Sequence, residues 1–185
     1  MLYVVGEVTG MTCLGNIMYV VCGGSSTIRL YNTDTFSPLD VVINVDGMRC
    51  PRDIVVCRDD RQLYVVDSTV FGPRCIWRVS VDSHTYVKWL PTESMTDRFN
   101  VTLLSLTSRR LLVTSSASLR QYHTTDRQLL RVIKMPGYVK HVYHGVETTR
   151  GTFIIGHNGT SQNMSQDAVS ELFRLCRLVK YCIIS

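Results

Sequence analysis

Pro51-Arg52-Asp53-Ile54-Val55-Val56 begins a run of four short segments that decides the fold. The next three segments are LYVVD at 63–67, IWRV at 76–79 and YVKWL at 86–90. Each is rich in β-branched and aromatic residues and is bounded by Gly, Pro, Asp or Ser, which is the pattern of a β-strand. We therefore predict four consecutive strands with no helix between them.

The same arrangement recurs about every 45 residues along the chain. The predicted first strands are at 8–13, 54–57, 101–106 and 139–143, and the second strands at 17–21, 63–66, 111–114 and 153–156. The third strands are at 28–31, 76–79, 119–122 and 168–172, and the fourth strands at 40–44, 86–90 and 129–134. Four strands per unit at this period predict an all-β fold of about four β-propeller blades. A β-sandwich is the alternative, although the regular Cys and Trp placements of an immunoglobulin-type sandwich are missing.

The second unit resembles the NHL repeat and the related YVTN-type propeller repeat. The resemblance rests on PRDIVV at 51–56, the turn at Asp59-Asp60, LYVVDS at 63–68 and IWRV at 76–79. The unit departs from that family where a Gly is usual, because Asp53 follows the Pro-Arg pair. The resemblance implies a propeller that binds proteins, RNA or small ligands on one face. A minority of such proteins are metal-dependent hydrolases or lyases.

Three predicted third strands lead within a few residues to an aspartate, namely Asp34, Asp82 and Asp126. An aspartate in a turn can accept hydrogen bonds from nearby backbone N–H groups. We therefore expect these three side chains to cap turns and to have a structural role.

The blade pattern covers residues 1–171, and residues 172–185 form a tail with a different period. The apolar positions of the tail have the spacing of an amphipathic helix: Leu172, Leu175, Cys176, Val179, Cys182 and Ile183. The fourth unit therefore lacks a fourth strand. We favour an incomplete or open ring, either part of a longer propeller or a protomer that self-associates to complete the ring. In the alternative, residues 2–5 supply the closing strand of a four-bladed ring.

The chain ends in Cys182-Ile183-Ile184-Ser185, which matches a C-a-a-X prenylation box. Basic residues precede the box, and Cys176 is a second candidate acylation site. Cys182 and Cys176 are thus the candidate lipidation sites, and we expect membrane binding only if Cys182 is prenylated.

Composition and motifs favour a cytoplasmic chain without catalytic chemistry. There is no secretory signal or long apolar run, and the seven cysteines contain no C-x-x-C pair. The net charge of +5 comes from scattered arginines, which suits solvated strand faces better than a nucleic-acid interface. His141 and His144 would point to opposite faces of a strand, so they predict no metal site. We identify no catalytic, cofactor-binding or metal-binding residue.

The sequence thus predicts a non-enzymatic binding platform that contacts another macromolecule, expected to be a protein, through its loops. The loops with the most candidate contact residues are 49–52, 67–74 and 158–167. One alternative is a fragment of a divalent-metal hydrolase or lyase of the propeller type. Another is a prenylated adaptor that is tethered to a membrane.

The prenylation hypothesis predicts a specific C-terminal peptide. In a eukaryotic host, Cys182 should gain a prenyl group and the last three residues should be removed. Mass spectrometry of that peptide checks both changes. An unmodified Cys182 with Ser185 still attached would contradict the hypothesis.

Overall fold

The structure, a computed structural model, describes residues 6–68, 75–91, 101–115, 118–135, 139, 142–148, 151–157 and 180–184. The regular elements in these ranges are all β-strands. Among the residues described, no helix is long and apolar enough to cross a bilayer. The prediction of an all-β chain is confirmed.

The strands form four antiparallel sheets, three of four strands and one of three. The first sheet contains β1 (Val8–Leu14), β2 (Ile17–Cys22), β3 (Thr27–Asn32) and β4 (Pro38–Asn44). The second contains β5 (Pro51–Cys57), β6 (Gln62–Asp67), β7 (Cys75–Ser80) and β8 (Tyr86–Pro91). The third contains β9 (Val101–Thr107), β10 (Arg110–Ser115), β11 (Ser118–His123) and β12 (Leu129–Lys134). The fourth contains β13 (Val142–Glu147), β14 (Phe153–His157) and β15 (Lys180–Ile184).

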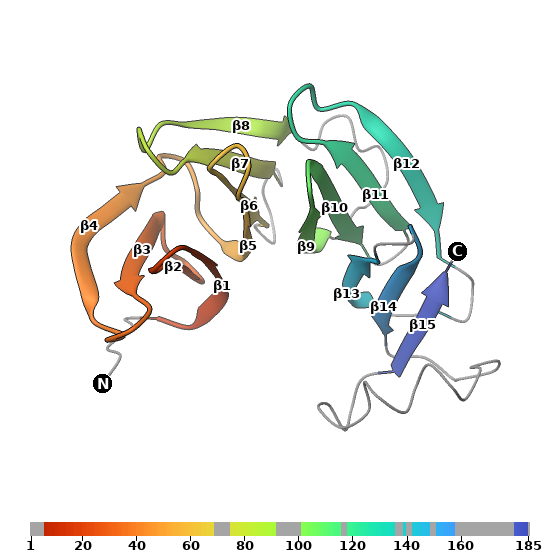
Figure 1. Ribbon diagram of the computed structural model, residues 1–185, viewed down its shortest axis with the longest axis horizontal. Helices are drawn as coiled ribbons and strands as arrows, with labels where there is room; N and C mark the ends of the chain where they lie inside the picture. Colours follow the sequence, from red (N-terminus) through yellow and green to blue (C-terminus); the bar gives the residue numbers. More distant parts are fainter. Residues whose placement is uncertain are drawn as a thin grey trace.

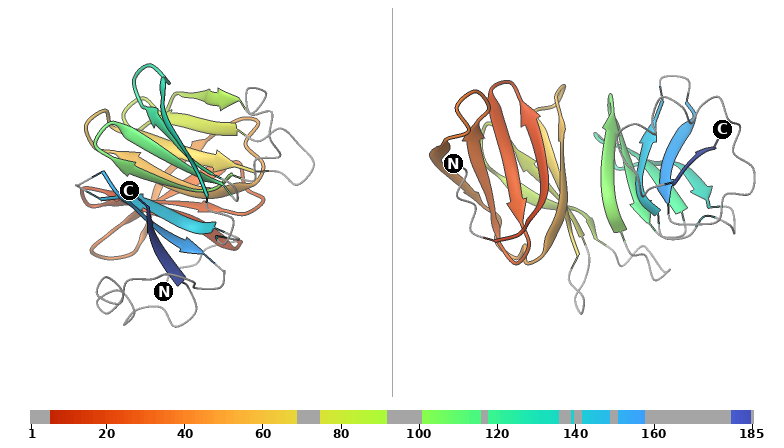
Figure 2. Two further views of the ribbon diagram at one scale, coloured as in Figure 1. Left: turned by 90° about the vertical axis from the view of Figure 1, so that its right-hand side faces the viewer. Right: turned by 90° about the horizontal axis from the view of Figure 1, so that it is seen from below.

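The four sheets follow one another in an open arc, as blades of a propeller do (Figure 1). Each sheet has its first strand on the inner side of the arc, and the inner strands β1, β5, β9 and β13 are successive neighbours. The first and fourth sheets lie at opposite ends of the molecule (Figure 2, right). This arrangement confirms the predicted open ring of about four blades.

Apolar side chains fill the space between each pair of consecutive sheets. The cluster between the first and second sheets includes Tyr19, Ile28 and Trp77, and the cluster between the third and fourth includes Leu119 and Phe153. The central strands β2, β6 and β10 are buried at nearly every position, so both faces of these strands are apolar. Burial of these faces is the main driving force that holds the sheets together.

Aromatic rings link the second sheet to the third. Trp89 is fully buried and lies edge-to-face with Tyr64 at 5.2 Å and with Tyr122 at 6.0 Å between ring centroids. Such pairs contribute about 0.5–1.5 kcal/mol beyond the area that they bury. The single tryptophan of β8 therefore connects strands of two blades.

The hairpin between the third and fourth strands has the same hydrogen bonds in three blades. In each, an i to i+4 backbone bond closes the turn, and the donors are Phe36, His84 and Arg127, all with positive φ. In each blade this turn also donates to the turn between the first and second strands, through the pairs Thr33–Asn16, Val81–Arg61 and Thr124–Arg109. Equivalent bonds at equivalent positions support the repeat that the sequence predicts.

Of the three aspartates predicted to cap turns, Asp126 does so as predicted, and Asp34 and Asp82 differ from it. Asp126 accepts from the backbone N–H of Gln128, as predicted, and lies 3.2 Å from Nδ1 of His123. Asp34 does not cap the first turn, because the side chain of Asn32 accepts from the backbone N–H groups of residues 34 and 35. Asp82 pairs with Arg61 at 2.8 Å between the two hairpins of the second blade.

The predicted C-terminal helix is wrong for residues 180–184, which form β15 along the edge of β14. The helical spacing of a short apolar run does not separate a helix from a strand, and β14 has an edge with backbone groups that need partners. Residues 172–179 of the predicted helix lie outside the described residues. So do the predicted third strand at 168–172 and the predicted closing strand at 2–5.

Asp67, at the end of β6, holds the connection between the first and second blades. Its buried carboxylate accepts from the backbone N–H groups of Arg49 and Cys50 at 3.1 and 2.7 Å. The indole N–H of Trp77 donates to the same carboxylate at 3.3 Å. Three donors on one buried carboxylate satisfy its charge, so Asp67 has a structural role rather than the ligand-contacting role expected for the 67–74 loop.

The inner strands approach one another closely at two junctions. Gly10 of β1 faces β5, where an added Cβ would lie 2.8 Å from Cα of Asp53 and 2.9 Å from the nitrogen of Ile54. Asp53 in turn accepts from the backbone N–H of Leu104 in β9 at 2.7 Å. Burial raises the pKa of Asp53 to about 6, although the N–H groups of Leu104 and Ile54 lower it.

Gly10→Ala should destabilise the fold because the new Cβ meets backbone atoms that cannot move aside. We expect the free energy of unfolding to fall by about 1–3 kcal/mol, measured by urea denaturation. Gly23→Ala is the control, since a Cβ at that position would lie 3.4 Å from Cγ2 of Thr9, an ordinary contact. Equal stability of the two variants would contradict the close approach of β1 and β5.

Asp53 should make the stability depend on pH. Its pKa is 3.8 in the unfolded chain and about 6 in the folded chain, so the folded state binds more protons between these values. The free energy of unfolding should therefore decrease by up to about 3 kcal/mol as the pH rises from 3.8 to about 6. Above about pH 6, the contribution of Asp53 to the free energy of unfolding should no longer change with pH.

Asp53→Asn should remove this part of the pH dependence, measured as the urea midpoint across that range. The exposed residue Asp59 offers a control, and Asp59→Asn should leave the slope unchanged. Parallel curves for the wild type and Asp53→Asn would disprove the role of Asp53.

Candidate binding site between the second and third blades

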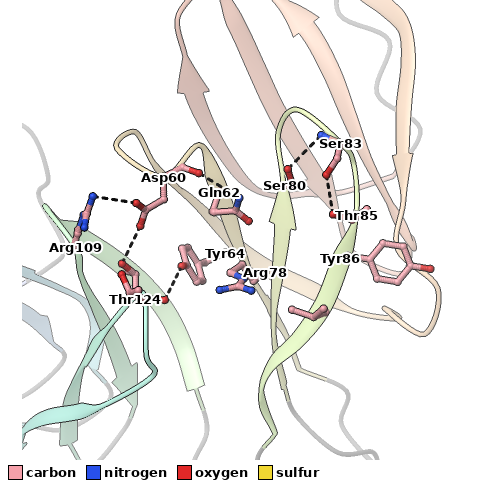
Figure 3. A pocket seen from close by; sticks show the side chains of 12 residues that line it. Asp60, Gln62, Tyr64, Arg78, Ser80, Ser83, Thr85, Tyr86, Arg109 and Thr124 are labelled. Carbon is pink, nitrogen blue, oxygen red and sulfur yellow. Dashed lines mark hydrogen bonds and ion pairs between the residues drawn. The ribbon is translucent and has the colours of Figure 1, made fainter.

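A polar cavity of about 440 Å³ lies between the second and third blades (Figure 3). The second blade contributes residues of β6, β7, β8 and the two turns of this end of the blade. The third blade contributes the turns before β10 and before β12. Both blades present the same kind of hairpin turn here, so the cavity is the space between two equivalent pairs of turns.

An ion pair joins the two blades at one wall of the cavity. Asp60, in the turn before β6, lies 3.4 Å from Nη2 of Arg109 in the third blade. The hydroxyl of Thr124 donates to the other oxygen of the same carboxylate at 3.4 Å. Asp60 therefore neutralises Arg109 and holds this wall together.

Tyr64 forms part of the inner wall. Its hydroxyl donates to the backbone carbonyl of Thr124 at 3.4 Å. Burial raises the pKa of Tyr64 to about 12, although the positive charge of Arg78 lowers it. Tyr64 is therefore a neutral hydrogen-bond donor at physiological pH and no base.

Arg78 is the cation of this cavity that has no partner within the described part of the chain. Its side chain is half-buried and lies between Tyr64 and the β7–β8 hairpin (Figure 3). No hydrogen bond or ion pair from another described residue reaches its guanidinium group. A half-buried arginine that is not neutralised by the protein favours an anionic ligand.

Hydroxyl groups line the opposite wall, along the β7–β8 hairpin. Ser83 and Thr85 form a hydroxyl–hydroxyl bond of 2.8 Å, and the backbone N–H of Ser83 donates to Ser80 at 3.3 Å. Hydroxyls both donate and accept, so this wall can bind the polar backbone of a ligand.

Exposed apolar side chains extend the site along the outer strands. Val87 of β8 lines the cavity and is 43% exposed. Leu129 and Val132 of β12 pair with Tyr122 and Arg120, so they share the sheet face that is directed at the second blade. The site thus combines Arg78, which has no partner among the described residues, with a set of hydroxyls and an apolar border.

A second cavity, of about 400 Å³, lies along the inner strands. Thr12 and Cys13 of β1, Ser105 of β9 and His144 of β13 are among its lining residues. Within the described ranges, no group of three His, Cys, Asp or Glu side chains could hold a metal ion. The divalent-metal hydrolase hypothesis therefore has no ligand set among these residues.

The loops predicted from the sequence contribute little to the site. The backbone N–H groups of Arg49 and Cys50 donate to Asp67, and residues 69–74 and 158–167 lie outside the described residues. Cys182 occupies a position in β15 opposite Ile155, and Cys176 lies outside the described residues. Lipid attachment at either cysteine stays a prediction.

Arg78 and its surroundings were not predicted from the sequence. A signal was present in the sequence. Arg78 is the one charged residue among residues 75–79 of β7, and the other four are all apolar. A charge in such a strand either forms a buried pair or faces a cavity. Only the neighbouring blade decides between the two.

Comparisons with solved structures support the same fold. No family model matches the chain, and no curated protein matches it. Hydrazine synthase of Kuenenia stuttgartiensis is similar with a TM-score of 0.65 and 13% identity, over 86% of this chain and 46% of that chain. The β-propeller domain of Cps50 (Swd1) from Myceliophteria thermophila is similar with a TM-score of 0.60 and 12% identity, over 82% and 49%. The chain has a β-propeller fold.

A computationally designed protein, Ika4, is similar with a TM-score of 0.59 and 12% identity, over 97% of this chain and 92% of that chain. The chain therefore spans about half the length of the two natural structures and most of the designed one. At this level of identity the likeness concerns the fold and not the function. The resemblance of the second unit to NHL and YVTN-type repeats stays a prediction.

Proposed function

We propose that this chain is a non-enzymatic binding platform that docks a segment of a partner protein between its second and third blades. The observation that supports this function best is Arg78, a half-buried cation in a polar cavity with an apolar border. A rigid scaffold that presents such a site at the turns of two blades is suited to recognition.

The chemistry of the site favours an acidic segment with at least one apolar side chain. The planar guanidinium of Arg78 can form two parallel hydrogen bonds with one carboxylate. Val87, Leu129 and Val132 supply apolar contact area beside it. The hydroxyls of Ser83 and Thr85 can satisfy the backbone groups of an extended peptide.

A protein partner is favoured over a nucleic acid by the placement of the aromatic rings at the site. Base recognition would require exposed aromatic rings in the cavity. Tyr64 is buried and donates its hydroxyl hydrogen to Thr124, and the ring of Tyr86 packs edge-to-face on Trp77. An acidic peptide needs only one carboxylate that reaches Arg78.

Selection from a phage-displayed library of random peptides tests this function. The wild-type chain should enrich peptides that contain Asp or Glu next to an apolar residue. Arg78→Gln should bind the enriched peptide about 10- to 150-fold more weakly, because it loses a charge-assisted pair worth about 1.5–3 kcal/mol. Arg78→Lys keeps the charge but not the planar guanidinium. Its affinity for the enriched peptide should lie between those of the wild type and Arg78→Gln.

Arg52→Gln is the matched control, since Arg52 is exposed on β5 and does not line the cavity. This variant should bind the enriched peptide as the wild type does. Enrichment of neutral peptides, or no loss of binding in Arg78→Gln, would overturn the proposed site. Binding of single-stranded RNA that depends on Arg78 would overturn the choice of a protein partner.

A further inference from the structure

The first sheet has an apolar face that packs on no other described sheet. One face of this sheet packs on the second sheet through the apolar cluster that includes Tyr19, Ile28 and Trp77. On the other face, Met18, Val20, Cys22 and Tyr31 form a separate buried cluster, which contains residues of β2 and β3 only. We call this face the free face of the first blade.

Exposed apolar side chains surround this cluster. The strand register places Val8 opposite Cys22, Met11 opposite Val20 and Val42 opposite Arg29, so all three belong to the free face. Their exposed fractions are 37% for Val8, 61% for Met11 and 44% for Val42. Apolar exposure on the two edge strands of one sheet face, β1 and β4, indicates an interaction surface.

The central strand of the first blade has the pattern of a strand with a neighbour on each side. Residues 18–22 of β2 are all apolar or aromatic, as are residues 63–66 of β6, which has a blade on each side. A strand that faces water on one side normally alternates apolar and polar residues. The first blade is therefore suited to a second neighbour.

The other end of the arc offers a face of the same kind. In the fourth blade, Val146 and Ile154 form a cross-strand pair on the side away from the third blade, and both are half-buried. Ile183 of β15 lies at the position opposite Ile154. The fourth blade thus presents apolar side chains on two adjacent strands, β13 and β14.

We propose that two copies of this chain form a closed ring, in which the free face of each first blade packs on the fourth blade of the other copy. Two copies bring together eight sheets, four from each, which is within the range of closed propellers. A two-fold axis generates both contacts at once, so no apolar end remains.

The arc itself favours a second copy as the occupant. The first and fourth sheets are the two ends of the arc and lie apart (Figures 1 and 2), so they cannot cover each other within one chain. The chain spans 49% of the matched Cps50 (Swd1) propeller chain, so two copies together correspond to about the length of that chain. The contact repeats the face-to-face packing that already joins consecutive blades inside the chain.

Light scattering coupled to size-exclusion chromatography measures the assembly directly. We expect a mass of about twice the 21.0 kDa of one chain, constant over a wide range of concentrations. A monomer at all concentrations would overturn the proposal. Oligomers that grow with concentration would overturn ring closure, because they indicate end-to-end contacts that do not close.

Charged substitutions at each end test which faces meet. Met11→Lys, in the first blade, and Ile154→Lys, in the fourth, should each give a monomer. When the two variants are mixed, a mixed dimer should form. The intact fourth blade of Met11→Lys can pack on the intact first blade of Ile154→Lys. A first-blade to first-blade dimer would survive Ile154→Lys, and that result would overturn the proposal.

Val87→Lys is the matched control, since it introduces the same charge at a 43% exposed valine between the second and third blades. It should remain a dimer. Val42→Lys provides a second variant at the free face of the first blade, in case Met11→Lys fails to fold. Circular dichroism and melting temperature establish that each variant is folded before its mass is measured.

Discussion

The structure depends on the burial of apolar sheet faces between consecutive blades. Strands such as β2, β6 and β10 are buried at nearly every position, so a single sheet would expose one apolar face or both to water. Each sheet is therefore stable only beside another. The arc is the result of repeating that contact, and the two end faces are the places where the contact lacks a partner within the described chain.

Close contacts at the inner side of the arc set the spacing of the blades. Gly10 allows β1 to approach the backbone of β5, and the carboxyl of Asp53 connects β5 with β9. Asp67 holds the segment that leads from the first blade to the second. These residues act on neighbouring blades rather than on ligands, so their chemistry belongs to the fold.

The candidate site follows from the same geometry. Between the second and third blades, Trp89 packs edge-to-face on Tyr64 and Tyr122 and fills part of the interface. Toward the turns, the space is lined by polar residues such as Asp60, Arg78 and Thr124 and remains open as a cavity. A binding site can form there without disturbing the apolar contacts that stabilise the blades, because it occupies only the region that the core does not fill.

The sequence by itself determined the all-β class and the order of strands in the first three blades. Period-2 patterns and turn residues are local, and they place most strands within a few residues of their observed limits. The same local reasoning failed for residues 180–184, where a strand takes the place of a predicted helix because the edge of β14 offers hydrogen-bond partners. Asp34 was also predicted to cap the turn between β3 and β4, where the side chain of Asn32 accepts the hydrogen bonds instead. The two residues are close together in sequence, and both side chains can accept hydrogen bonds.

Only the tertiary structure decided where the site lies. Arg78 and Arg109 are both arginines in strand-rich sequence, yet Asp60 of another blade neutralises Arg109 and leaves Arg78 without a described partner. The local pattern of a strand determines which face a side chain occupies, but it says nothing of the charge on the facing blade. The physical reason is that charge pairing and cavity shape arise between segments that are distant in sequence, and they exist only once the blades have packed.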